Sequence, residues 1–230
     1  MAENLQRIEQ LRKSMVVDVA HEIRTPLTNI RGYLEALYDG VIALSQAPVE
    51  SLLEETLRLG ELVDALLQLA RADAAKTTLD LQGLLLRKLI DHTLDIFRPQ
   101  LVAKGITVNT QVAASADLAL ADPGKLAQVV HNLFQNACQY TPPGGHVQCR
   151  TERLPAEIKL TLTNTSEGIA PNDLPFIFER FYRAEKSRSR KHGGAGIGLA
   201  IVKELIAAHG GRVGAKTSAT KTHIWFTLPV

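Results

Sequence analysis

The strongest constraint on the fold is a repeat of apolar side chains near the start of the chain. They recur at alternating spacings of four and three residues, at Val16, Ala20, Ile23, Leu27, Ile30, Leu34, Leu37 and Val41. This spacing is typical of a helix that buries one stripe against a partner helix. The same alternation returns at Leu52, Thr56, Leu59, Val63, Leu66 and Ala70. Because the segment 40–48 between them is short, the pattern predicts an antiparallel helical hairpin that buries its remaining apolar surface by dimerising into a four-helix bundle.

Composition narrows the class of protein. Basic and acidic side chains nearly cancel, 26 against 24, so the overall charge gives no reason to expect a nucleic-acid partner. The two cysteines, Cys138 and Cys149, lack a paired CxxC spacing, which argues against a disulfide scaffold or a zinc site. No apolar run approaches the roughly 20 residues that span a bilayer.

The pattern changes after the second helix. We expect residues 1–14 to be the incoming end of a coiled coil from an upstream region, 15–75 to be the helical domain, 76–78 a linker, and 79–230 a second domain. Within the second domain we expect strands at 79–86, 106–112, 147–153, 157–163, 211–216 and 223–228, and helices at 87–104, from Pro123 with Asp122 as N-cap, and at 196–209. This mixture predicts an α+β sandwich with helices on one face of a sheet. The long polar segment 165–195 is predicted to be a functional loop, a lid over the site.

His21 is the first candidate for chemistry. It lies one residue off the buried stripe, and its face of the helix carries the small residues Thr25, Thr28 and Gly32. Pro26 should kink or loosen the helix one turn later. A lone histidine on a helix is more often solvated and without a role, so these neighbours are what favours a functional one. A zinc-protease helix would need a second histidine where Thr25 stands, so that alternative is rejected.

The run from His21 to Leu27, His-Glu-Ile-Arg-Thr-Pro-Leu, resembles the H-box of the sensor histidine kinases of two-component systems. The resemblance implies that His21 accepts the phosphoryl group. It also implies that Glu22 acts as base or holds the tautomer, and that Thr25 serves removal of phosphate from the partner. The implied folds are the dimeric phosphoacceptor bundle and the α+β ATP-binding fold of the gyrase, chaperone and histidine kinase group.

A second motif lies on the helix that begins at Pro123. The run 132–137, Asn-Leu-Phe-Gln-Asn-Ala, followed by Tyr140, resembles the N-box of the same family. Two amides one turn apart also occur as structural polar networks. The resemblance implies that Asn136 binds Mg²⁺, with Asn132 nearby and Tyr140 lining the purine pocket.

A glycine-rich run completes the expected ATP site. The segment 193–200 resembles the G2-box, which implies ATP-binding roles for Gly194, Gly196, Gly198 and Leu199, and a helix that turns its positive end towards phosphates. The spacing does not fit a dinucleotide-binding turn. The run 178–183 resembles the F-box, from which Arg183 would face the phosphates.

The chain departs from the family pattern at the G1-box. Where the family reads Asp-x-Gly-x-Gly, the positions hold Asn164, Ser166 and Gly168. The family's aspartate accepts a hydrogen bond from the adenine amino group, and Asn164 can accept one only without charge. Gln139 replaces a basic residue, and 219–223 lacks the late Gly-x-Gly. Asn164 predicts weaker adenine binding, and the departures together leave open a weakened or inactive kinase.

The resemblance implies the catalytic core of a sensor histidine kinase that uses ATP and Mg²⁺. Its partners would be a second copy of the chain and the receiver domain of a response regulator, towards which it would also be a phosphatase. We expect a cytoplasmic fragment of a protein anchored in a bacterial inner membrane, with no nucleic-acid partner. A degenerate kinase, acting as a nucleotide-binding scaffold or as a phosphatase only, is the alternative. An ATPase of the gyrase, chaperone or mismatch-repair type is disfavoured, because its water-activating glutamate is replaced by Asn132.

Overall fold

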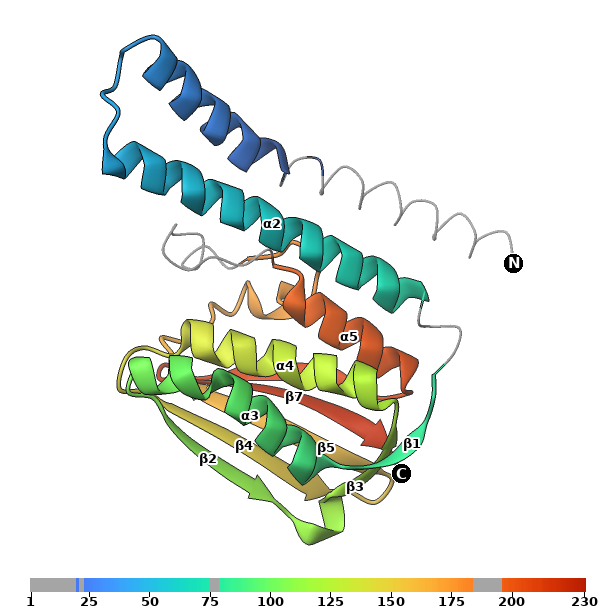
Figure 1. The fold of residues 1–230 in the computed structure, drawn as a ribbon. Helices are drawn as coiled ribbons and strands as arrows, with labels where there is room; N and C mark the ends of the chain where they lie inside the picture. Colours follow the sequence, from blue (N-terminus) through green and yellow to red (C-terminus); the bar gives the residue numbers. More distant parts are fainter. Residues whose placement is uncertain (1–19, 21–22, 75–78, 184–195) are drawn as a thin grey trace.

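The helical part of the chain is an antiparallel hairpin. The computed structural model describes residues 20, 23–74, 79–183 and 196–230, and residues 23–38 form one helix that runs through the buried Pro26. After a turn, α2 (Gln46–Ala74) runs back along it (Figure 1). The amide of Asn29 donates a hydrogen bond to Glu55 Oε1 at 2.8 Å, which joins the two helices of the hairpin. The predicted hairpin is therefore confirmed.

The second part of the chain is built on a five-stranded sheet in the order β2-β4-β5-β7-β6. The strands are β2 (Thr107–Val112), β4 (His146–Arg153), β5 (Glu157–Thr165), β6 (Val213–Thr217) and β7 (Lys221–Pro229). β2 and β4 are parallel, and the other neighbours are antiparallel. Along β5 every second residue is buried, so one face of the sheet is apolar and the other is polar.

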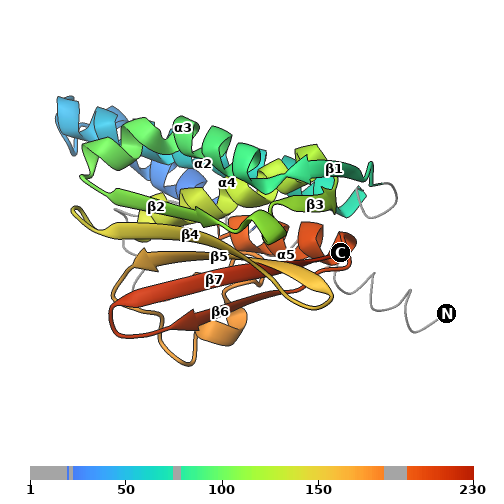
Figure 2. The same ribbon diagram turned by 90° about the horizontal axis from the view of Figure 1, so that it is seen from below.

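Three helices cover the apolar face, α3 (Leu86–Ala103), α4 (Pro123–Tyr140) and α5 (Gly198–Ala208) (Figure 1). α4 begins as predicted, because Asp122 accepts from the backbone N–H of Lys125 at 3.0 Å and Pro123 follows it. Phe134 and Phe226 are among the largest fully buried side chains of the core between helices and sheet. The α+β layer predicted from the sequence is confirmed, and Figure 2 shows α3 and α4 on the same side of the sheet.

The hairpin and the α+β layer touch through α2 and α5. α2 lies on the side of α5 away from the sheet (Figure 1), and Leu62 of α2 is only 2% exposed. Among the described residues, none of the helices combines the length and the apolar character that crossing a membrane would require.

Several predicted boundaries were wrong. The strand expected at 79–86 is only β1 (Gln82–Leu85), which pairs with β3 (Leu118–Ala121), a strand that was not predicted from the sequence. Alanines and leucines favour strands weakly, so the residues of β3 carried no local signal. β6 begins at Val213 rather than 211. Much of the predicted apolar stripe is exposed in the single chain, including Leu27 (55%) and Leu34 (52%).

Candidate nucleotide site

α4 presents the two asparagines of the predicted site. Asn132 is 6% exposed, and its side-chain amide donates a hydrogen bond to the backbone carbonyl of Gly198 at 3.3 Å. Asn136 and Tyr140 follow one and two turns later on the same face and are half-buried. The bond to Gly198 leaves the carbonyl oxygen of Asn132 as an acceptor.

The start of α5 lies directly against α4. A Cβ on Gly198 would lie 4.0 Å from Cβ and Cγ of Asn132, an ordinary van der Waals distance, so the two helices are in contact at this point. Gly196 has a φ of +67°, and a Cβ there would lie 2.9 Å from the carbonyl oxygen of Tyr182. The N-terminal N–H groups of α5, together with the helix dipole, favour an anion such as a phosphate at this end.

The F-box segment is held against α5 by ion pairs. Lys203 Nζ lies 2.7 Å from Glu179 Oε1, and Arg180 Nη2 lies 3.4 Å from Glu204 Oε1. Arg183 follows on the same segment and is half-buried. The structure thus brings the F-box beside the glycine-rich start of α5. Gly194 lies outside the described residues.

The G1 positions lie where β5 ends. Asn164 is 4% exposed, and its amide donates to the carbonyl oxygen of Thr165 at 3.1 Å. Gly168 has a φ of +77°, and a Cβ there would lie 2.4 Å from the carbonyl oxygen of Ser218. Gly168 is therefore required by the turn itself, whatever its part in binding. Leu199 is partly buried against the core.

Of the three catalytic candidates, only Thr25 lies in the part of the chain that the structure describes. His21 and Glu22 are outside the described residues. Thr25 is exposed on the first helix.

The donor set suits Mg²⁺ as part of a nucleotide complex. Mg²⁺ prefers oxygen ligands and usually binds through one or two protein groups together with phosphates and water. The amide oxygens of Asn132 and Asn136 meet that need. Within the described ranges no group of three His, Cys, Asp or Glu side chains gathers into a metal site.

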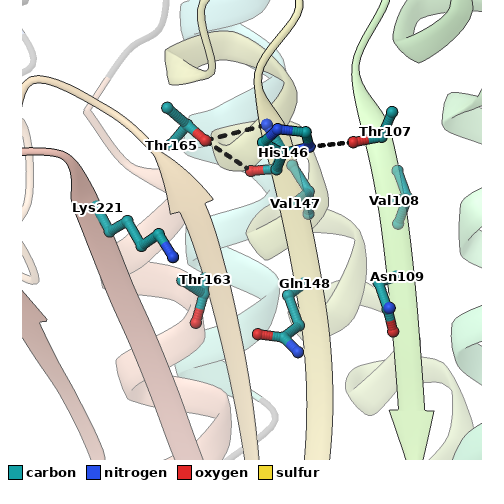
Figure 3. A pocket seen from close by; sticks show the side chains of 9 residues that line it. All are labelled: Thr107, Val108, Asn109, His146, Val147, Gln148, Thr163, Thr165 and Lys221. Atoms are coloured by element: carbon teal, nitrogen blue, oxygen red, sulfur yellow. Dashed lines mark hydrogen bonds between the residues drawn. The ribbon is translucent and has the colours of Figure 1, made fainter.

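A separate hollow lies on the polar face of the sheet, with a volume of about 400 Å³. Figure 3 shows Lys221, Thr163 and His146 around it, and no predicted site residue lines it. The hollow is thus distinct from the asparagines of α4, which lie beyond the sheet on its helix-covered side.

Two threonines beside the G1 positions were assigned no role from the sequence. Thr222 is 5% exposed and bonds to Ser166 through their hydroxyls at 2.7 Å. Thr217 Oγ1 accepts from the backbone N–H of Ile169 at 3.0 Å. The sequence carried a signal for Thr222 only. It is a polar residue in the same alternating register of β7 as the buried Ile224 and Phe226.

Comparison with known proteins agrees with this geometry. Residues 11–75 match the His Kinase A (phospho-acceptor) domain, and residues 121–230 match the histidine kinase-, DNA gyrase B- and HSP90-like ATPase family.

Individual relatives support the same assignment. The signal transduction histidine-protein kinase BaeS of Escherichia coli (strain K12) is 34% identical over 213 residues, which cover 93% of this chain and 45% of the relative. The solved ShkA full-length structure, in complex with AMPPNP, is 27% identical with a TM-score of 0.66, over 94% of this chain and 45% of ShkA. Histidine kinase ThkA in complex with response regulator protein TrrA is 22% identical and matches in fold with a TM-score of 0.81, over 99% of this chain and 65% of that one.

The chain spans less than half the length of BaeS. The two matched domains occur in the same order as the hairpin and the α+β layer. The chain belongs to the family of sensor histidine kinases.

Proposed function

We propose that the chain is the catalytic core of a sensor histidine kinase that transfers the γ-phosphoryl group of ATP to His21. The observation that carries the proposal is the bond from Asn132 to the carbonyl of Gly198. It holds the amides of α4 against the glycine start of α5, and so places oxygen ligands beside a helix end that favours phosphate.

The start of α5 and the polar residues of α4 bind different parts of the ATP complex. The N–H groups at the start of α5 donate to the phosphate oxygens, and Arg183 adds positive charge nearby. Mg²⁺, held by Asn136 with Asn132 beside it, would neutralise charge on the phosphates. Tyr140, one turn beyond Asn136, supplies apolar surface for the purine.

The reaction at the hairpin is a displacement at phosphorus. A neutral imidazole nitrogen of His21 attacks the γ-phosphorus, the bond to the β–γ bridging oxygen breaks, and ADP leaves with that electron pair. Glu22 takes the imidazole proton. Binding both reactants in one assembly replaces a bimolecular encounter, which is the main contribution a protein makes to phosphoryl transfer.

The phosphoryl group then passes to an aspartate of a response regulator. ThkA, which shares the fold of this chain, was solved in complex with response regulator protein TrrA, and this supports the same class of partner here. Thr25 is exposed and stands four residues after His21 in the sequence, and we expect its hydroxyl to orient water for hydrolysis of the phosphorylated regulator.

A homodimer is part of the proposal. Leu27, Leu34, Leu53 and Leu57 are each more than half exposed on the hairpin of the single chain. Apolar exposure of this extent marks a surface that a second copy covers. By family resemblance, the parent protein is anchored in a bacterial inner membrane, with this part in the cytoplasm.

The test is labelling with γ-labelled ATP and Mg²⁺. The wild type should take up a label that acid removes, since phosphohistidine is acid-labile, and His21→Gln should take up none. His92→Gln, at an exposed histidine on α3, is the matched control and should label like the wild type. Label that persists in His21→Gln would exclude His21 as acceptor. ATP binding without any label would instead favour the phosphatase-only or scaffold alternative.

A further inference from the structure

The hollow on the polar face of the sheet is lined by polar side chains from neighbouring strands. They are Thr107 and Asn109 of β2, His146 and Gln148 of β4, Thr163 of β5 and Lys221 of β7 (Figure 3). Asn109 lies directly opposite Gln148, and Gln148 lies opposite Thr163, so these three stand in one row across the face. The hollow is therefore built on the strands of the sheet themselves.

The side chains of this lining can all donate hydrogen bonds. Lys221 is exposed, and among the described residues its ammonium group makes no hydrogen bond or ion pair. The hydroxyl of Thr107 bonds to Nδ1 of His146, and when the hydroxyl is the donor, the ring proton is on Nε2, which can donate as well. The amides of Asn109 and Gln148 are exposed, and each has two N–H groups.

The charge of the hollow is positive, because no carboxylate of the described residues lines it. The five strands of the sheet carry two carboxylates, and both lie beside other basic groups. Glu152 lies 3.9 Å from Lys159, and Glu157 lies 2.9 Å from Arg212. Each is at least four residues along its strand from the lining of the hollow, which is about 13 Å or more. The charge of Lys221 is therefore not neutralised by a carboxylate of the sheet.

The volume of the hollow suits a small molecule. Ligand pockets in proteins are typically about 300–1,000 Å³, and this one is about 400 Å³. We propose that the hollow binds the phosphate group of a small hydroxylated molecule such as a sugar phosphate. Lys221, which points towards Thr163 in Figure 3, binds the phosphate together with His146. The row of Asn109 and Gln148 binds the hydroxyl groups. The inference is independent of the nucleotide site.

A phosphate monoester fits this lining better than a carboxylate does. It carries about 1.5–2 negative charges at neutral pH and has three strong acceptor oxygens. It can therefore accept from an ammonium, an imidazole and a hydroxyl group at the same time, through charge-assisted bonds. A carboxylate has one charge and two oxygens. The amides of Asn109 and Gln148 both donate and accept, as neutral hydroxyl groups of a sugar require.

The test is a titration with ribose 5-phosphate, followed by the backbone amide NMR signals of the 230-residue chain. AMPPNP and Mg²⁺ are present throughout to fill the nucleotide site. The signals that move should be those of residues 107–109, 146–148, 163–165 and 221–223. We expect a dissociation constant of about 1 mM, since salt screens exposed charges. Inorganic phosphate should bind about fivefold more weakly, because it offers no sugar hydroxyl groups to the amides.

Two variants test the lining. Lys221→Met removes the ammonium group and should weaken the binding of ribose 5-phosphate about tenfold or more. Gln148→Glu keeps nearly the same shape and adds a carboxylate, so it should abolish binding. Lys216→Met is the matched control, because it removes the same charge from an exposed position of β6 that does not line the hollow. It should bind within about twofold of the wild type.

The inference would be overturned if only signals elsewhere moved, or if Lys221→Met and Gln148→Glu bound ribose 5-phosphate like the wild type. Equal affinities for inorganic phosphate and ribose 5-phosphate would overturn the role of Asn109 and Gln148. A chain that does not bind AMPPNP would refute the proposed function instead. The test of the hollow would still hold in that case, because the signals that move identify the site.

Discussion

The imidazole of His209, at the end of α5, accepts a hydrogen bond from the backbone N–H of Asp122 at 3.0 Å. Its other nitrogen, Nδ1, donates to the carbonyl oxygen of Leu205 at 2.7 Å. One nitrogen must accept and the other donate, so the ring is the neutral Nδ1–H tautomer. Asp122 also caps α4, so this side chain ties the C-terminal end of α5 to the N-terminal end of the helix that carries Asn132 and Asn136.

His209→Ala should lower the free energy of unfolding by about 2–3 kcal/mol. The side chain is 9% exposed, and its removal leaves the Asp122 N–H buried without an acceptor and creates a cavity. Urea unfolding followed by the fluorescence of Trp225, the single tryptophan, measures the loss. His92→Ala, at an exposed position of α3, should stay within about 0.5 kcal/mol of the wild type. Equal stability of the two variants would show that the His209 bridge is not stabilising.

Asp122→Asn should be less stable than the wild type at neutral pH and equal to it in strong acid. Desolvation works to raise the pKa of the Asp122 carboxyl. The N–H and ammonium groups of Lys125 and the N–H of Asp80 outweigh it, so the pKa lies below 3.8. A carboxyl with a lowered pKa stabilises the fold fully above its unfolded value, and the effect is lost as the pH falls through the folded value.

Urea midpoints measured from pH 7 down to pH 2 test this. We expect a gap of about 1 kcal/mol at pH 7, because asparagine still caps the helix but loses the ion pair with Lys125, whose Nζ lies 3.1 Å from Asp122 Oδ2. The gap should close below pH 3.8, the ordinary value for this side chain. If the difference in stability between the wild type and Asp122→Asn did not change with pH, the charge of the Asp122 carboxylate would not stabilise the fold.

Gly168→Ala should be more damaging than Gly144→Ala. Both glycines have positive φ, +77° and +73°, so alanine is strained at either position by about 1 kcal/mol. Around Gly144 a Cβ would meet nothing within 4 Å, whereas at Gly168 it would lie 2.4 Å from the carbonyl oxygen of Ser218. The clash adds about 1–3 kcal/mol and displaces the N–H that bonds to Ser166.

Thermal unfolding and ATP titration of the two variants give the comparison. Gly144→Ala should bind ATP like the wild type, and Gly168→Ala should bind it more weakly. If both variants lost the same free energy of unfolding, the loop around Gly168 would be able to move away from the added Cβ without destabilising the fold.

If the chain forms the proposed dimer, Leu34→Lys/Leu57→Lys should convert it to a monomer. The two side chains are 52% and 62% exposed in the single chain, and a second hairpin would bury them. A buried, unpaired ammonium group costs several kcal/mol. Light scattering coupled to size exclusion should report about twice 25.1 kDa for the wild type and 25.1 kDa for the variant. Leu44→Lys, in the turn and 81% exposed, should remain a dimer. A monomeric wild type would refute the bundle.

Local patterns predicted the elements that carry the site. The spacing of apolar residues predicted the hairpin, and Asp122 with Pro123 predicted the start of α4, because periodicity and helix capping act within a few residues. The asparagines of α4 and the glycines before α5 were recognised through their resemblance to the N-box and the G2-box. β3 was missed, since its stability comes from pairing with β1 and not from its own residues.

The contacts that make these elements into a site were not predictable from the sequence. Asn132 and Gly198 are 66 positions apart, Ser166 and Thr222 are 56 apart, and Asp122 and His209 are 87 apart. Each pair joins a side chain to a group whose position depends on how whole helices and strands pack. The sequence by itself determined which faces of the helices and strands are apolar and which residue types are available to bind phosphate. Only the tertiary structure decided which donor meets which acceptor, because a hydrogen bond depends on distances of a few tenths of an ångström that periodicity does not encode.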